Sequence, residues 1–156
     1  ELANSRRIAE MLGRMPHPYG EVEAKSFIQN SRRREKGGCV YAITNSDSGA
    51  FVGCAGLDAR PHGLELGYWI GEPFARRGYM TEALAATRDH AFGALDLSRI
   101  EAACLPENAA SRGLLEISGF KYEGVAQSYL QIDGRWRTHV LYAALRSDRR
   151  GRTEAG

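Results

Sequence analysis

Several features that mark specialised classes of protein are scarce or missing in this sequence. No apolar run approaches the length of a membrane-spanning helix and no signal peptide opens the chain, so we expect a cytoplasmic protein with no membrane partner. The cysteines number only three and lack C-x-x-C spacing, which favours buried thiols over a metal site or a catalytic cysteine. The net charge is only +2, so direct nucleic-acid binding is not expected.

What remains is the composition of an ordinary globular domain. The 156 residues are 43% hydrophobic and 26% charged, which suffices for one buried core without disulfides or metal. We assign residues 1–146 to a single domain. Residues 147–156 form a basic segment with no apolar pattern, and we expect this tail to be disordered because it can bury nothing to offset its ordering entropy.

The most informative stretch runs from residue 64 to residue 91. Residues 64–70 are aromatic and aliphatic and end at a Gly-Glu-Pro breaker, which predicts a buried strand. From Met80 onward apolar residues recur at helical spacing. Arg76, Arg77 and Gly78 lie between the two elements. A loop that enters a helix N-terminus presents unpaired N–H groups, and a glycine lets an anion approach them, so this stretch predicts a phosphate-binding loop.

The rest of the chain alternates between helical and strand patterns. Two helices separated by a proline-rich loop are expected first, followed by an antiparallel hairpin, the central strand, loop and helix, a parallel strand, a helix capped by Asn108, and a closing hairpin. The fold class predicted is therefore mixed α/β, with a mostly antiparallel twisted sheet and helices on both faces. The expected ranges are 5–13, 21–34, 39–44, 51–57, 64–70, 79–92, 99–105, 108–119, 120–133 and 136–145.

Several short motifs in this order resemble one known family. Gly-Tyr-Trp-Ile at 67–70 and Arg-Gly-Tyr-Met-Thr-Glu-Ala at 77–83 resemble the acetyl-CoA-binding motif of GCN5-related N-acetyltransferases (GNAT). The Asn-x-x-Ser at 108–111 and the Leu-Glu-x-x-Gly-Phe at 115–120 are similar to later motifs of that family. The branch that looks most similar contains the ribosomal-protein N-terminal (RimJ/RimL-like) acetyltransferases. The family normally opens with a strand that is not found here, which would leave one sheet edge unpaired.

The resemblance implies acetyl-CoA as cosubstrate, no metal, and a set of cofactor-binding residues. The pantetheine arm would lie along the strand edge at Tyr68, Trp69 and Ile70, and the pyrophosphate on the loop and helix start. Asn108 and Ser111 would form a polar pair on the cofactor side, although Asn108 is explained equally by helix capping. The loop and helix positions are Arg76, Arg77, Gly78, Tyr79, Met80 and Thr81.

Acetyl transfer requires a neutral amine, an oxyanion donor and a proton source for the leaving thiolate. By resemblance, a backbone N–H near Trp69 or Ile70 is the oxyanion donor and Ser111 the residue that reaches the thiol. Glu65 lies on the same strand side as Trp69 and is the candidate general base, with a solvated strand end as the alternative.

Some positions depart from the family pattern or have a simpler explanation. Ala75 stands where the family often carries Arg or Gln, and Met80 stands where it often carries a small residue. Leu130 stands where some relatives carry a carboxylate. For three residues of the closing hairpin, aromatic packing is favoured over contact with the acceptor. For two residues of the first loop, a purely structural role in the loop explains them at least as well as contact with the substrate. These are Tyr129, Trp136 and His139 in the hairpin, and His17 and Tyr19 in the loop.

The leading functional hypothesis is an acetyl-CoA-dependent N-acetyltransferase acting on a protein N-terminal α-amine by direct attack in a ternary complex. A small-molecule amine, such as an aminoglycoside, polyamine or amino acid, is the close alternative acceptor. A non-catalytic acyl-CoA-binding module is an alternative from another class, and a nucleotide-binding α/β domain rests on the phosphate loop alone. A homodimer is one possible assembly.

Overall fold

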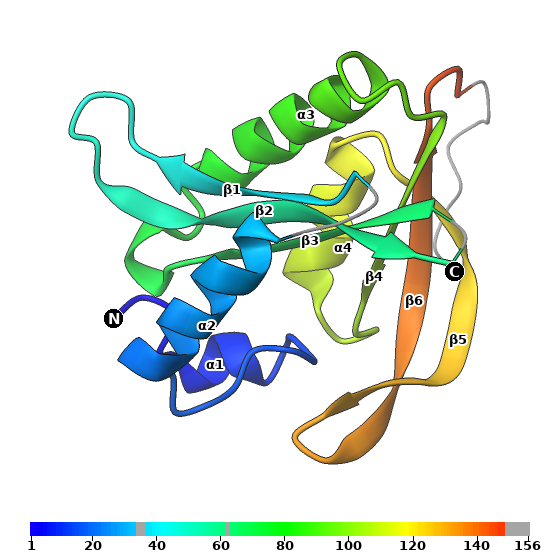
Figure 1. The fold of residues 1–156 in the computed structure, drawn as a ribbon. Helices are drawn as coiled ribbons and strands as arrows, with labels where there is room; N and C mark the ends of the chain where they lie inside the picture. Colours follow the sequence, from blue (N-terminus) through cyan, green and yellow to red (C-terminus); the bar gives the residue numbers. More distant parts are fainter. Residues whose placement is uncertain (34–36, 62, 149–156) are drawn as a thin grey trace.

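The computed structural model describes residues 1–33, 37–61 and 63–148, which form one mixed six-stranded sheet with helices on both faces (Figure 1). The strand order is β1-β2-β3-β4-β6-β5, and every neighbouring pair is antiparallel except β3 and β4. The elements are α1 (Arg6–Ala9), α2 (Glu21–Arg32), β1 (Cys39–Thr44), β2 (Phe51–Arg60), β3 (Gly63–Ile70), the 3₁₀ helix η1 (Glu72–Phe74), α3 (Tyr79–Phe92), β4 (Arg99–Cys104), α4 (Ala109–Ile117), β5 (Lys121–Ile132) and β6 (Arg135–Leu145).

The parallel pair β3 and β4 is joined by α3, as the sequence predicted. Pairing between the two strands covers only Leu64 to Leu66 on β3 and Ile100 to Ala102 on β4. Beyond that point β4 stays paired with β6, through Cys104 and Val140, while β3 stays paired with β2. The sheet is therefore split between its two central strands on the side where β3 ends.

One face of the sheet carries the dry core. The helix α3 buries Met80, Leu84, Thr87 and Ala91, which lie on the stripe that the sequence predicted. Together with Leu115 of α4, these residues cover the inward side chains of the central strands, including Leu57, Leu66, Ile100 and Tyr142. Burial of this apolar surface, at about 25 cal/mol per Å², is the main force that holds α3 and α4 to the sheet.

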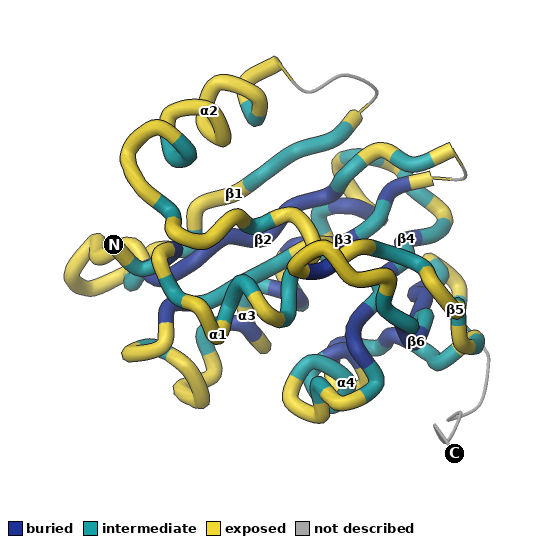
Figure 2. Tube along the Cα trace, turned by 90° about the horizontal axis from the view of Figure 1, so that it is seen from below, coloured by how far each residue is buried: buried dark blue, intermediate teal, exposed yellow. Residues whose placement is uncertain are grey.

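The opposite face is only loosely covered. The helix α2 contains no buried residue, although Val22, Phe27 and Ile28 on it are apolar, and it lies over β1 and β2 as a separate layer (Figures 1 and 2). The loop before it is the proline-containing segment that the sequence predicted. The space under α2 is a cleft that is described below.

Several boundaries differ from the predicted ones. The first helix is a single turn, Arg6–Ala9, and not residues 5–13, since the bonds that follow it are of the shorter i to i+3 kind. The chain then approaches the closing hairpin, where a β-carbon on Gly13 would lie 3.0 Å from the Gln131 carbonyl oxygen. The second strand extends to Arg60, and β4 ends at Cys104. Residue 34 of the predicted second helix, and the predicted tail from residue 149, lie outside the described residues.

Within the described ranges, no helix is long and apolar enough to cross a membrane. The same ranges contain no group of three or more His, Cys, Asp and Glu side chains arranged to hold a metal ion. The thiols of Cys54 and Cys104 are buried, as expected, whereas Cys39 is half-buried, and all three are free.

Candidate active site

The split between β3 and β4 leaves backbone polar groups without a strand partner. Successive residues of a strand direct their N–H and C=O groups to alternate sides, and the Gly71 N–H donates to the Val52 carbonyl on the β2 side. By this alternation the backbone groups of Trp69 point toward β2, and those of Tyr68 and Ile70 point into the gap. A ligand with amide groups can pair with this edge as an additional strand would.

The helix α3 begins beside the gap and offers a second set of unpaired donors. Its first internal hydrogen bond runs from the Glu82 N–H to the Gly78 carbonyl, so the N–H groups of Tyr79, Met80 and Thr81 have no acceptor within the helix. Gly78 adopts φ 84°, and a β-carbon there would meet nothing within 4 Å. The positive end of the helix dipole therefore faces open space, which is the arrangement that binds phosphate groups.

The two loop arginines are exposed, and neither forms a hydrogen bond or ion pair within the described part of the chain. Arg76 has φ 61°, a left-handed backbone conformation that costs a non-glycine residue about 1–3 kcal/mol. The side chains that follow are structural, because Met80 is in the core and the Tyr79 hydroxyl accepts a hydrogen bond of 2.8 Å from the Asn45 amide. Tyr79, Met80 and Thr81 are thus placed to bind an anion through their backbone.

On the core side of the gap, three predicted residues come together. The Tyr68 hydroxyl forms a short hydrogen bond with the Ser111 hydroxyl. Asn108 caps α4, since its side-chain oxygen accepts from the Ser111 N–H at 3.1 Å. Burial is the largest influence on Tyr68 and raises the pKa of its phenol. Tyr68 and Ser111 therefore stay neutral hydroxyls at physiological pH and can act as hydrogen-bond donors at the gap.

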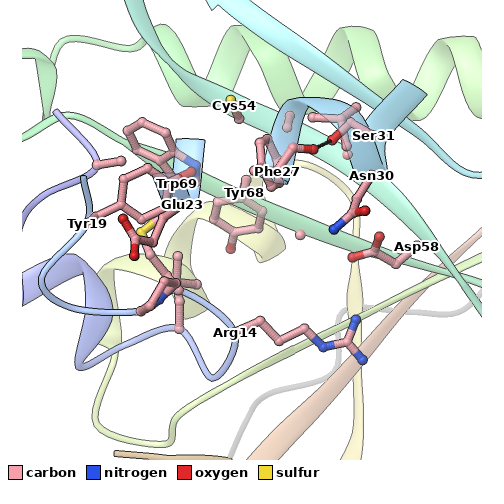
Figure 3. Close-up of a pocket in the computed structure, with 18 of the residues that line it drawn as sticks. Arg14, Tyr19, Glu23, Phe27, Asn30, Ser31, Cys54, Asp58, Tyr68 and Trp69 are labelled. Atoms are coloured by element: carbon pink, nitrogen blue, oxygen red, sulfur yellow. Dashed lines mark hydrogen bonds between the residues drawn. The ribbon is translucent and has the colours of Figure 1, made fainter. Parts of the chain in front are cut away.

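On the other side of the gap lies a cleft of about 1210 Å³ between the sheet and α2. Its floor is formed by β1, β2 and β3, with Glu65, Gly67 and Trp69 on one strand face, and its roof by apolar side chains of α2 such as Phe27. Figure 3 shows Asn30 of α2 and Asp58 of β2 directed toward one another across the cleft. Tyr19 of the first loop also lines the cleft, whereas His17 does not.

Glu65 is held in place by contacts from two other strands. Its Oε2 accepts a hydrogen bond of 2.8 Å from Arg60 Nε and a longer one, 3.4 Å, from the Tyr129 hydroxyl. Its side chain is 12% exposed and that of Arg60 is 22% exposed, so the pair lies well inside the surface. Oε1 forms no hydrogen bond within the described residues. The carboxylate is therefore fixed at one oxygen and available at the other, as a positioned base requires.

The three aromatic residues predicted in the closing hairpin differ in their surroundings. The rings of Tyr129 and His139 pack against each other, as predicted, with their centroids 5.4 Å apart. His139 also lines the cleft. Its Nδ1 atom lies 3.1 Å from the Arg137 carbonyl oxygen. Because a carbonyl only accepts, Nδ1 carries the proton and Nε2 is left as an acceptor. The packing prediction was wrong for Trp136, which is 62% exposed.

Sequence reasoning missed the acidic and basic side chains that surround Glu65. Arg60 and Asp58 belong to an extension of β2 that was read as a loop, and Arg14 enters the cleft from the N-terminal segment (Figure 3). The alternation of Cys54, Gly56, Asp58 and Arg60 was the available signal, since it places all four on one strand face.

Cys54 on the cleft face gives a prediction about stability. Burial raises the pKa of its thiol from 9.0 to about 11, so the folded state holds this proton more tightly than the unfolded state. The stabilisation is complete below about pH 9 and is lost as the pH rises through 11, by at most about 2–3 kcal/mol. We expect Cys54→Ala to flatten the fall in the free energy of unfolding over this range, measured by urea titration. Cys39→Ala, at a less buried thiol, is the control that should keep the slope, and equal slopes for both variants would contradict the assignment.

The site and the fold together define a class of protein. A mixed sheet split between two parallel strands, with an anion-binding helix start at the split, is the architecture of the GNAT acyltransferases. The comparison of structures agrees, because the crystal structure of Mycobacterium smegmatis RimJ in complex with CoA-disulfide superposes with a TM-score of 0.82 at 30% sequence identity. The match covers 92% of this chain and 73% of that one.

The comparison of sequences identifies the family directly. A model of the acetyltransferase (GNAT) domain matches residues 1–121, and this chain belongs to the GNAT family. The [ribosomal protein uS5]-alanine N-acetyltransferase of Escherichia coli (strain K12) is 32% identical over 130 residues, which are 81% of this chain and 67% of that enzyme. A probable N-acetyltransferase, YjcK, of Bacillus subtilis (strain 168) is 40% identical over 83 residues, or 53% of this chain and 46% of that protein. The relatives thus include the ribosomal-protein branch predicted from the motifs. The chain spans about half to two thirds of the length of these two relatives.

The residues described here fit acetyl-CoA. The unpaired edge at Tyr68 and Ile70 matches the amides of a pantetheine arm, and the open helix start at Gly78 matches a pyrophosphate. Arg76 and Arg77, which form no ion pair within the described residues, provide positive charge for the phosphates.

Proposed function

We propose that this chain is an acetyl-CoA-dependent N-acetyltransferase that acts on a protein N-terminal α-amine. The observation that carries the proposal is the split between β3 and β4, which joins an anion-binding helix start on one side to a cleft with a positioned carboxylate on the other. A site that only stored acyl-CoA would need the first feature but not the second.

The cosubstrate supplies an acetyl group activated as a thioester. In the proposed mechanism Glu65 accepts the proton of the acceptor amine through Oε1, directly or through one water molecule. The Ile70 N–H, which points into the gap, donates a hydrogen bond at the position where negative charge develops. Ser111, which is hydrogen-bonded to Tyr68, donates a hydrogen bond to the departing thiolate. The thiolate takes its proton from solvent, Glu65 releases the amine proton to solvent, and the Arg60 guanidinium keeps Glu65 directed into the cleft.

The preference for an α-amine rests on the cost of deprotonation. An α-amine with a pKa near 8 costs about 1.4 kcal/mol to deprotonate at pH 7, whereas a lysine side chain costs about 4.6 kcal/mol. A site whose positioned carboxylate, Glu65, is already paired with the Arg60 guanidinium is better matched to the smaller cost. The Escherichia coli relative is named as an N-acetyltransferase of an alanine of a ribosomal protein, which supports the same class of acceptor.

The test is a steady-state assay of thiol release with acetyl-CoA and a panel of peptides that differ only in their free N-termini, together with the same peptides blocked at the N-terminus. We expect turnover with free peptides only, and mass spectrometry should locate the acetyl group on the α-nitrogen. Acetylation confined to polyamines or aminoglycosides would replace the acceptor class. Tight binding of acetyl-CoA without release of thiol in the presence of any amine would identify a binding module.

A further inference from the structure

Three glycines lie within the paired strands β2 and β3 at Gly53, Gly56 and Gly67, of which Gly56 and Gly67 line the cleft. Gly53 and Gly56 are required by packing. A β-carbon on Gly53 would lie 2.3 Å from the Trp69 carbonyl oxygen, and one on Gly56 would lie 2.8 Å from the Cys39 carbonyl oxygen. Real side chains do not approach backbone atoms this closely. Neither position can carry a larger residue without moving a neighbouring strand.

At Gly67, by contrast, packing does not require a glycine. A β-carbon there would meet only the Asp58 Oδ2 atom, at an ordinary contact distance of 3.9 Å, and the backbone is not among those with positive φ. Glycine in the interior of a central strand weakens the strand, because it gains no packing and loses the most chain entropy. Its presence at this position therefore has no explanation in the fold and calls for one in the site.

The position of Gly67 supplies that explanation. It lies between Glu65 and Trp69 on the face of β3 that forms the cleft floor, and it is exposed although β3 is an interior strand. Because Gly67 has no side chain, it leaves a hollow two residues along β3 from Glu65, the proposed base. A group that lies over Gly67 in the cleft is therefore beside Glu65 on the same strand face.

We propose that Gly67 sets the size limit of the acceptor subsite, by leaving room for the side chain of the residue that carries the reacting amine. The inference rests on the proposed function, since it assumes an acceptor that approaches Glu65 from the cleft. A side chain at position 67 would project into that room and exclude acceptors with a large first residue.

The experiment compares the wild-type protein with Gly67→Ala and Gly67→Val on peptides that begin with Gly, Ala, Leu or Phe and are otherwise identical. Each methyl group that meets the acceptor should lower kcat/KM by about tenfold or more. We expect the loss to be smallest for the Gly peptide and largest for the Phe peptide, and greater for Val than for Ala. The KM for acetyl-CoA should stay unchanged.

Gly113→Ala is the matched control. Gly113 lies in α4, where a β-carbon would meet nothing within 4 Å, and it does not line the cleft. This variant should keep the wild-type order of peptides. Thermal melting of all three variants without ligand should give a Tm no lower than that of the wild type, which separates a change in selectivity from a loss of folding.

The possible results are distinguishable. A size-dependent loss in the Gly67 variants alone supports the inference. An equal loss for every peptide, or no loss, overturns it while leaving the proposed function intact. If the wild-type protein acetylates no peptide at all, the proposed acceptor class fails and this inference fails with it.

Discussion

Glu65→Gln is expected to lower kcat by about 100-fold or more, the usual contribution of a positioned general base. The amide has the size of the carboxylate and can still accept hydrogen bonds from Arg60 and Tyr129, but it cannot take a proton from the amine. Binding of acetyl-CoA should be spared, because Glu65 lies on the cleft side of the split. Single-turnover assays and a binding titration with acetyl-CoA measure the two effects separately.

Glu101→Gln is a suitable control for this variant. Glu101 lies opposite Glu65 in the register of β3 and β4, but it pairs with Arg99, at 3.0 Å, and does not line the cleft. It should therefore keep wild-type turnover. If Glu65→Gln retained full activity with an unchanged dependence of kcat on pH, Glu65 would not be the base, and His139, whose ring also lines the cleft, would be the next residue to test.

Gly78→Val is expected to weaken acetyl-CoA binding by about 100-fold, or roughly 2.7 kcal/mol. Gly78 has φ 84° at the start of α3, and a β-branched residue in that conformation is strained by about 1–3 kcal/mol. Relief of the strain would turn the free N–H groups of Tyr79 to Thr81 away from the anion. The added methyl groups would also occupy the open space that the phosphates need. Isothermal titration with CoA measures the loss.

Gly49→Val separates the loss of the site from a general loss of stability. Gly49 has φ 71° in the turn between β1 and β2, and a β-carbon there meets nothing within 4 Å, so the backbone penalty is similar. Both variants should lower the Tm of the free protein by comparable amounts, and only Gly78→Val should reduce the shift produced by CoA. Equal affinity for CoA in the two variants would remove the phosphate-binding role from the start of α3.

These two predictions address opposite sides of the split sheet. A protein that binds acetyl-CoA but transfers nothing would respond to Gly78→Val and be indifferent to Glu65→Gln. An N-acetyltransferase would respond to both, in affinity for the first variant and in turnover for the second. The pair of variants therefore also distinguishes the enzyme from the non-catalytic module.

The sequence alone determined the elements whose signals are local. The apolar stripe of α3 and the cap at Asn108 each depend on residues within one or two turns of the helix, and each is where the pattern predicted it. The open start of α3 at Gly78 was predictable for the same reason, because a glycine before a helix start is a short-range feature.

The surroundings of Glu65 were decided by the tertiary structure. Arg60, Glu65 and Tyr129 come from three strands, and Tyr129 reaches the carboxylate only because β5 has a bulge between Ala126 and Leu130, where four residue steps oppose two on β6. Register and bulges depend on pairing between segments far apart in the chain, which a periodic pattern does not encode.

The cleft itself was likewise beyond the sequence. The helix α2 was predicted from its own periodicity, and its apolar residues, none of which is buried, form the roof of an open space. A helical stripe records which residues share a face and not how close the opposite surface lies. Local patterns in the sequence thus determined the fold class and the open start of α3, and the spacing of layers, set only when the whole chain packs, decided the cleft around Glu65.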